Sequence, residues 1–276
     1  MSSVKEKPLL IIPVYNGGDF FRDCYESVIG KESSFEMVFI SLNGTPTGRA
    51  ADQETLKSFG KPAENVVLLE TPTVLSSFDH QNFLIDAVSK RYSDDRLVMS
   101  LFHDDVLLRA PSRDECNPES VILGDWRNLL ESGLITALKR SPISPTEWMS
   151  SFLFHRIPTN GSGMVAPLGV MRDVSLSLRK WRTGVRFEYL LCTHSSVKSL
   201  CAVKEPLVSL RIHDMQEGAN VDLPSFVRGE AMFMAWLFSH RRAVGIPGLA
   251  VVIFLGLALI KNAAARLLAR NPTQRR

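Results

Sequence analysis

Short apolar runs alternate with helix-like segments over roughly the first 110 residues of the chain. Four of these runs predict strands, at Pro8–Val14, Met37–Leu42, Val66–Leu69 and Leu97–Phe102. Between them, the apolar residues of Phe20–Ile29 and His80–Lys90 recur at helical spacing. Strands that alternate with helices form βαβ units, so the sequence predicts an α/β fold with a mostly parallel sheet flanked by helices.

The pattern is less regular in the second half of the chain. Asp125–Lys139 has helical spacing, Met164–Val170 is an apolar run, and Val203–Ile212 predicts another strand. We expect one α/β domain over residues 1–225 and a helical tail over residues 226–276.

The tail contains an uncharged apolar segment, Ala243–Ile260. Its 18 residues would rise ~27 Å as a helix, which is near the lower limit for crossing a bilayer. Pro247 weakens a straight span, and Arg241, Arg242 and Lys261 on the two flanks leave the orientation open. Three interpretations remain: a membrane-surface helix pair, a true span, or a buried helix at an oligomer interface.

Charge is distributed unevenly along the chain, whose formal net charge is +3. From Phe226 onward there are eight Lys or Arg residues and one acid, Glu230, which gives +7 and leaves −4 on the first 225 residues. A mildly acidic body with a basic apolar tail favours an anionic membrane surface as partner and disfavours nucleic acid. The composition, 45% hydrophobic and 22% charged, is that of a globular protein able to bury a core.

The cysteines and the N-terminus favour a cytoplasmic location. Cys24, Cys116, Cys192 and Cys201 fit no zinc-site spacing and are too few for a disulfide scaffold. We therefore expect free thiols in a reducing compartment. The first apolar run is short and contains Pro13, so it predicts a buried strand rather than a signal sequence.

The fourth predicted strand leads directly into His103-Asp104-Asp105. In parallel α/β sheets, ligands bind at the carboxyl ends of the strands. Adjacent carboxylates there are hard oxygen ligands that suit Mg²⁺ or Mn²⁺ on a diphosphate. His213, after the last predicted strand, could complete such a site through a neutral imidazole. The alternatives are a solvated acidic turn and an ordinary surface or core histidine.

Two further clusters contain candidate functional residues. Glu188 lies in an apolar setting, where burial raises a carboxyl pKa and suits it to act as a general base, or it pairs with a nearby arginine. Asp79 and Asn82 lie at the start of the second predicted helix. They either recognise a base or ribose, or Asp79 or Ser77 caps the helix.

Four segments together resemble the inverting GT-A glycosyltransferases of family 2. They are Ile11–Gly18 (Ile-Ile-Pro-Val-Tyr-Asn-Gly-Gly), the strand end Asn43-Gly44-Thr45, the segment Phe78–Asn82, and the acidic end of the fourth strand. The resemblance runs from about Lys7 to about Asn220. It implies a GT-A fold, a nucleoside diphosphate sugar donor and a divalent metal, Mn²⁺ or Mg²⁺.

The resemblance also implies a role for individual residues. Those that would bind the nucleotide sugar are Pro13, Val14, Tyr15, Asn43, Asp79, Asn82, His103, Asp104 and Arg211. Those that would hold the metal are Asp105 and His213, the catalytic base would be Glu188, and the residues where acceptor and donor meet would be Ser162, Gly163 and Met164.

The chain departs from the family pattern at two strand ends. Many members have Asp-Asp-Gly-Ser or Asp-Asn-x-Ser after the second strand, where this chain has Leu42-Asn43-Gly44-Thr45. His103 stands where the first Asp of the Asp-x-Asp signature would be. Both changes remove acidic groups from the donor site, and they leave the donor and the strength of the metal dependence open.

We therefore expect a glycosyltransferase that moves a sugar from a nucleoside diphosphate to an acceptor hydroxyl with inversion, at the inner face of a cell membrane. By analogy, the tail suggests a polyprenyl-diphosphate-linked saccharide acceptor in O-antigen or capsule synthesis. Two alternatives are a non-catalytic binding or scaffolding subunit and a nucleotidyltransferase. The loop after the first strand, Tyr15–Gly18, has no Lys or Arg to hold phosphates, which disfavours the nucleotidyltransferase.

Overall fold

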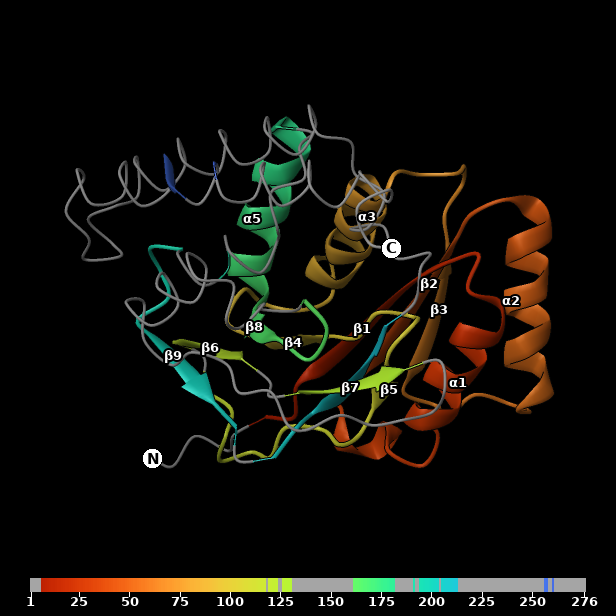
Figure 1. Ribbon diagram of the computed structural model, residues 1–276, viewed down its shortest axis with the longest axis horizontal. Helices are drawn as coiled ribbons and strands as arrows, with labels where there is room; N and C mark the ends of the chain where they lie inside the picture. Colours follow the sequence, from red (N-terminus) through yellow and green to blue (C-terminus); the bar gives the residue numbers. More distant parts are fainter. Residues whose placement is uncertain are drawn as a thin grey trace, which may run out of the picture.

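A computed structural model of the chain describes residues 6–117, 119–123, 126–130, 161–181, 191, 194–203, 205–212, 256–257 and 260. The main sheet has seven strands in the order β3-β2-β1-β4-β8-β6-β9 (Figure 1). In that order, their bounds are Val66–Glu70, Val38–Asn43, Leu9–Tyr15, Leu97–Ser100, Val165–Pro167, Ser120–Leu123 and Ser199–Ala202.

The four strands predicted from the N-terminal half are mutually parallel. β1 pairs with β2 and β4, and β2 pairs with β3. Tyr15 at the end of β1 aligns with Asn43 at the end of β2, so the carboxyl ends of these strands lie at one edge of the sheet. β8 runs antiparallel to both β4 and β6, and β6 is parallel to β9. The predicted mostly parallel sheet is confirmed, with β8 running against its neighbours.

A second, three-stranded sheet has the order β5-β10-β7, with bounds Val106–Leu107, Val208–Ile212 and Trp126–Leu130. β10 lies within the predicted strand Val203–Ile212. The helix predicted over Asp125–Lys139 is wrong for its described part, because Trp126–Leu130 forms β7. All five of these residues pair in parallel with β10, and this tertiary pairing overrides the helical spacing of the apolar side chains.

Helices cover both faces of the main sheet (Figure 1). Their bounds are Gly18–Val28 (α1), Pro46–Ser58 (α2), Ser77–Ser89 (α3) and Leu168–Trp181 (α5), with a short 3-10 helix, η1, at Glu32–Ser34. Alternate residues of β1 contribute to two separate cores. Leu10 and Ile12 pack in the core that includes α1 and α2, whereas Leu9 and Ile11 pack in the core that includes α3 and α5.

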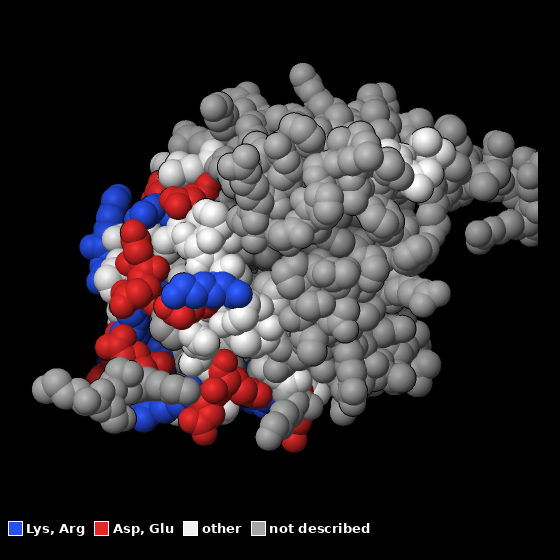
Figure 2. Space-filling view, turned by 90° about the vertical axis from the view of Figure 1, so that its left-hand side faces the viewer, with Lys and Arg blue, Asp and Glu red and all other residues white. Residues whose placement is uncertain are grey.

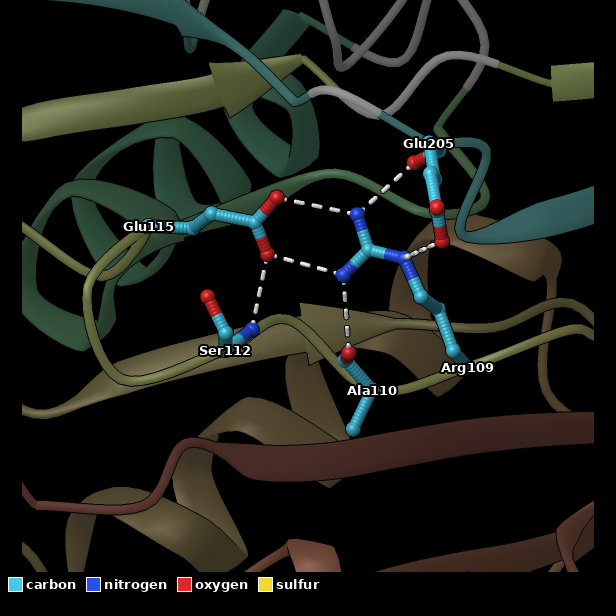
Figure 3. Close-up of polar contacts among 5 residues, drawn as sticks. All are labelled: Arg109, Ala110, Ser112, Glu115 and Glu205. Carbon is cyan, nitrogen blue, oxygen red and sulfur yellow. Dashed lines mark hydrogen bonds and ion pairs between the residues drawn. The ribbon is translucent and has the colours of Figure 1, made fainter.

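An ion-pair cluster joins the segment after β5 to the residues that precede β10 (Figure 3). The Arg109 guanidinium donates to both carboxylate oxygens of Glu115, at 2.8 and 2.9 Å, and to the backbone oxygens of Ala110 and Glu205. Burial opposes ionisation of Glu115, but hydrogen bonds from Arg109 and from the Ser112 N–H outweigh it and lower the pKa of Glu115 to about 2. The pair therefore stays charged at neutral pH and holds the short β5–β10 ladder in register.

Acidic and basic side chains lie side by side on the described part of the face in Figure 2. Elsewhere in the described chain, Lys198 pairs with Glu119 at 2.5 Å, and Arg172 donates to both oxygens of Asp94 at 2.6 and 2.7 Å. Exposed pairs of this kind each contribute about 1 kcal/mol or less to stability, so the two apolar cores carry most of the folding energy.

The predicted tail falls mostly outside the described residues. Only Gly256, Leu257 and Ile260 of it are described, and the last two side chains are exposed. None of the helices in the described parts of the chain has the length and apolar character needed to cross a bilayer. The division into residues 1–225 and 226–276 stays a prediction.

Candidate functional site

Three of the predicted polar clusters meet at the carboxyl edge of the main sheet. β1 ends at Tyr15 and β2 at Asn43, which align in the parallel ladder. β4, on the other side of β1, leads into the acidic turn, defined here as His103-Asp104-Asp105. Segments that are distant in sequence therefore form one rim at the place where ligands of parallel α/β sheets bind.

Asn16 locks the loops that follow β1 and β2. Its φ of +46° lies in the left-handed region, which Asn tolerates better than most residues. Its Oδ1 accepts the N–H of Thr45 at 3.0 Å. A Cβ on Gly44 or Gly48 would clash with the Asn16 amide, so both glycines are required by this close approach.

Asp52 of α2 holds the first turn of α1. Its fully buried carboxylate accepts the N–H of Gly17 at 3.2 Å and of Gly18 at 3.0 Å. Burial raises the pKa of Asp52, while these two N–H bonds and the nearby His103 act to lower it. An acid at a helix N-terminus is stabilised by the helix dipole, so Asp52 fixes α1 against the rim.

His80 of α3 is a second buried titratable residue beside the site. Its Nε2 lies 2.8 Å from the Ser41 hydroxyl in β2. Burial lowers the pKa of His80 to about 4, and His103 adds to the decrease against the opposing effect of Ser41. The imidazole is therefore neutral at physiological pH. Sequence analysis assigned no role to either residue. Asp52 belongs to no recognisable motif, and α2 itself has few apolar residues. His80 lies within the segment Phe78–Asn82, but its burial against Ser41 depends on packing that no local pattern reveals.

Asn43, a predicted nucleotide ligand, binds its own chain. The side chain is fully buried, and its Nδ2 donates to the Leu75 oxygen at 2.9 Å. Its Oδ1 accepts from the Thr71 hydroxyl at 3.0 Å and from the Leu75 N–H at 2.9 Å. The structure thus gives Asn43 the task of shaping the loop between β3 and α3. Direct contact with a nucleotide stays a prediction.

Asp79 and Asn82 take part in the start of α3. The N-cap is Ser76, and neither Ser77 nor Asp79 occupies that position. The Ser76 hydroxyl accepts the Asp79 N–H at 3.2 Å and lies 2.8 Å from its carboxylate. Asn82 donates to the Phe78 oxygen of its own helix at 2.8 Å. The predicted capping of this helix by Ser77 or Asp79 is therefore wrong, because Ser76 is the cap. Recognition of a base or ribose by Asp79 or Asn82 stays a prediction.

Asp105 is the most deeply buried carboxylate of the acidic turn. Only 3% of it is exposed, and its Oδ1 accepts the backbone N–H of Arg211 at 2.9 Å. Burial, with the neighbouring charge of Asp104, raises the pKa of Asp105 well above its usual range, although hydrogen bonds from Arg211 and Ser162 oppose the shift. When a buried carboxylate has a second carboxylate as its neighbour, an added cation strongly stabilises its ionised form.

Arg211 holds the acidic turn against α1. Its Nε donates to the Asp104 backbone oxygen at 3.1 Å, and its Nη2 forms an ion pair with Asp23. The guanidinium lies over the ring of Phe20, 5.0 Å from its centroid. Only 14% of the Arg211 side chain is exposed. Its predicted contact with a diphosphate stays a prediction.

The predicted acceptor segment packs against the end of β4. The Ser162 hydroxyl accepts the Phe102 N–H at 3.1 Å, and the Gly163 N–H donates to the Ser100 oxygen at 2.8 Å. Gly163 has a φ of +82°, and a Cβ there would press on Val208. The structure therefore brings Ser162, Gly163 and the buried Met164 beside the acidic turn. Their contact with an acceptor is untested.

The remaining predicted site residues differ in accessibility. Tyr15 is 47% exposed on the rim, whereas Val14 is fully buried in the core shared with α1. Pro13, which precedes Val14, is partly buried. Glu188 and His213 lie outside the described residues. No three His, Cys, Asp or Glu side chains converge as a metal-binding group in the described parts of the chain.

A surface hollow of about 520 Å³ lies at the opposite edge of the sheet. Its lining residues are Glu6, Lys7, Ser33, Phe35, Glu36, Glu64, Asn65 and Arg113. Several of these directly precede β1, β2 and β3, so the hollow is at the amino ends of the strands. Since parallel α/β sheets bind ligands at the carboxyl ends, we place the candidate site at the acidic turn instead.

Comparison with solved structures shows a similar fold in S. aureus TarS. The TarS crystal structure has a TM-score of 0.58 at 10% identity, with 90% of this chain and 42% of TarS covered. Structures of TarS 1-349 in complex with UDP-GlcNAc and with UDP give TM-scores of 0.58 and 0.57 at 10% and 11% identity. They cover 90% of this chain and 70% and 69% of theirs.

This likeness shows the fold alone, and it confirms the predicted GT-A fold. The chain spans less than half the length of TarS, at 42%. No protein-family model matches the chain, and no curated protein has a similar sequence.

Replacing Asp105 with Asn should stabilise the ligand-free protein by about 0.5–2 kcal/mol at pH 7. A carboxyl whose pKa is raised on folding binds more protons in the folded state, so its stability contribution falls as pH rises above about 4. The advantage of Asp105→Asn should therefore shrink as pH falls from 7 towards 4. Urea unfolding across this range measures it.

Asp94→Asn, which removes an exposed carboxylate outside the site, is the matched control. It should show no such gain in stability at pH 7. A less stable Asp105→Asn protein at pH 7 would show that the Asp105 charge is well compensated in the ligand-free fold.

Proposed function

We propose that the chain is a nucleotide-sugar-dependent glycosyltransferase. The observation that carries the proposal is the placement of Asp105 and Asp104 at the carboxyl end of β4, beside the loop after β1. A GT-A fold with two carboxylates at this edge supplies what a nucleoside diphosphate donor needs. The fold shared with TarS, which has been solved with UDP-GlcNAc and UDP, makes uridine nucleotides the first donors to test.

The donor set of the acidic turn fits a divalent cation, Mn²⁺ or Mg²⁺. Asp104 and Asp105 offer hard oxygen ligands, and the burial that disfavours an ionised Asp105 would be offset by a positive charge. In the proposal Asp105 and His213 would hold the ion, and Asp104 would contact the nucleotide sugar beside it. When bound, the ion neutralises the charge that develops on the diphosphate leaving group.

The residues of this chain would carry out the transfer as a single displacement. Glu188 takes the proton of the acceptor hydroxyl, whose oxygen bonds to the anomeric carbon as the bond to the diphosphate oxygen breaks. Attack from the face opposite the leaving group inverts the configuration. Tyr15 on the exposed rim lines the nucleotide pocket, and Asp79 reads the base with Asn82 nearby. Ser162–Met164 form the wall between donor and acceptor.

One observation favours the alternative of a non-catalytic binding or scaffolding subunit. The amides of Asn43 and Asn82 bond their own chain. Such internal hydrogen bonds are also expected in a protein that has kept the fold but no longer binds a nucleotide sugar. The two proposals differ in whether the acidic turn binds a metal together with a nucleoside diphosphate.

Thermal unfolding with UDP, GDP, dTDP and CDP, each with and without Mn²⁺, tests the proposed function. At 100 times its Kd a ligand stabilises the folded state by ~2.7 kcal/mol, which for a domain of this size raises the midpoint by roughly 5–10 °C. We expect such a shift with one diphosphate, strengthened by Mn²⁺ and lost in Asp105→Asn but kept in Asp94→Asn. No shift with any of the four would favour the non-catalytic subunit.

Glu188→Gln tests the catalytic base. Glutamine preserves the size of the side chain but cannot accept the acceptor proton, so the metal-dependent shift with the preferred diphosphate should be unchanged. Transfer, measured as release of that diphosphate in the presence of acceptor, should fall by ~10²–10⁴-fold. Transfer close to the wild-type rate would remove Glu188 from this role.

The proposal places the acceptor at a membrane, as a polyprenyl-diphosphate-linked saccharide at the cytoplasmic face. It is supported by the basic tail and by the exposed apolar side chains of Leu257 and Ile260. The intact chain should co-sediment with anionic vesicles, weakly at high salt, and a chain without Ala243–Ile260 should stay in the supernatant. Equal sedimentation of both chains would contradict this role of the tail.

A further inference from the structure

We infer that Asp23 and Phe20 of α1 are positioning residues, which hold the Arg211 side chain against the acidic turn and thereby fix Asp105 in the orientation that the proposed function requires. The role of Asp105 in that inference rests on the proposed function. The contacts themselves do not depend on it.

Arg211 makes two sets of contacts, one through its backbone and one through its guanidinium group. Its backbone N–H donates to the Asp105 carboxylate at 2.9 Å. Its guanidinium pairs with Asp23, donates to the Asp104 backbone oxygen at 3.1 Å and lies over the Phe20 ring. The residue therefore links the end of β10 to both carboxylate-bearing residues of the acidic turn and to α1.

The contacts from α1 restrict the guanidinium more than a single surface ion pair would. Asp23 and Phe20 lie three residues apart, so they share one face of the helix. Asp23 forms an ion pair with the guanidinium, whose central carbon lies over the Phe20 ring, and this combination suits Arg better than Lys. The Arg211 side chain is only 14% exposed, which strengthens both contacts.

Among the described residues, the donors to Asp105 are the Arg211 backbone N–H and the Ser162 side chain. The Asp105 carboxylate is almost completely buried. Of the contacts that stabilise its ionised form, the hydrogen bond from the Arg211 backbone N–H is the largest, and the hydrogen bond from the Ser162 side chain is the next largest. If the guanidinium were released from α1, the end of β10 would lose its anchor. The Arg211 N–H and the Asp105 oxygen would then separate more often.

The resemblance assigns Arg211 another task, direct contact with the diphosphate. The two assignments differ in how removal of the Asp23 carboxylate should change the affinity for the diphosphate. If Arg211 binds phosphate, Asp23 competes for the guanidinium and its removal leaves binding unchanged or tightens it. If Arg211 is a positioning residue, removal of Asp23 weakens binding as much as a change in Arg211 does.

Amide hydrogen exchange at Arg211, followed by NMR on the full chain without ligand, tests the contacts alone. Asp23→Asn should raise the exchange rate of the Arg211 N–H by ~10-fold, the equivalent of one weakened charge-assisted hydrogen bond. Phe20→Leu should raise it by a smaller factor. The Asp23 side chain is 48% exposed and belongs to neither apolar core, so Asp23→Asn leaves the core packing unchanged. Asp94→Asn is the matched control and should leave the Arg211 rate unchanged.

A double-mutant cycle with UDP and Mn²⁺ as probes separates positioning from direct contact. Asp23→Asn, Arg211→Lys and the double variant should each weaken Mn²⁺-dependent UDP binding by a similar ~10-fold, with the double variant no worse than either single one. Loss of binding only in the Arg211→Lys variants, with Asp23→Asn unchanged or tighter, would overturn the inference.

The two arms keep the inference distinct from the proposed function. If the wild-type chain binds neither Mn²⁺ nor UDP, the proposed function loses its support, and the exchange rate of the Arg211 amide alone decides. A rise in Asp23→Asn that is absent in Asp94→Asn supports the positioning role. An unchanged rate in Asp23→Asn overturns it whatever the nucleotide does.

Discussion

Buried polar side chains at the carboxyl edge of the sheet form hydrogen bonds between loops that are distant in the sequence. Asn43, Asp52 and Asp105 are each at most 3% exposed, and each accepts backbone N–H groups from another segment of the chain. A buried carboxylate or amide without such partners would cost on the order of 1–3 kcal/mol or more, so the loops can move away only at that cost. These polar contacts hold the rim of the site together with the apolar core beneath it, which includes Val14, Leu42 and Leu101.

The same constraint carries a conflict at Asp105. Its burial beside Asp104 disfavours the charge that a metal ligand needs, and two donors only partly offset this. Asn43 shows the contrasting case, because its amide has no charge to lose and makes three bonds to one loop. A fold selected for stability alone would have an uncharged side chain, such as an amide, at position 105 as well. Its retention as a carboxylate is the strongest physical reason to regard the acidic turn as functional.

The sequence predicted those parts of the structure that depend on apolar periodicity. β1, β2 and β4 were found within a residue or two because parallel strands buried on both faces are continuous apolar runs. The partly exposed edge strand β3 was found as well, because Val66–Leu69 is also an apolar run. α2 was missed because its few buried residues include Asp52 and Thr55, which no hydrophobic pattern reveals. β7 was assigned as a helix because its pairing with β10, some 80 residues away, leaves no local trace.

Site residues followed the same division between local and non-local information. The placement of Tyr15, Asn43 and the acidic turn at one edge could be predicted, since the carboxyl ends of parallel strands coincide. Which of them face solvent could not, because that depends on partners such as Leu75 for Asn43 and Arg211 for Asp105.

Asp52 bears on the two departures from the family pattern, at Leu42-Asn43 and at His103. Its carboxylate lies close enough to His103 to interact with it electrostatically. It does not take the place of the missing acidic groups, because it is not exposed to a ligand. It is fully buried and bonds the Gly17 and Gly18 N–H groups, so its charge serves the N-terminus of α1. The described site is therefore less acidic towards solvent than the family pattern implies, and Asp104 is its more accessible carboxylate. Any diphosphate bound there meets less repulsion from the protein, which lowers the need for a metal without removing the means to hold one.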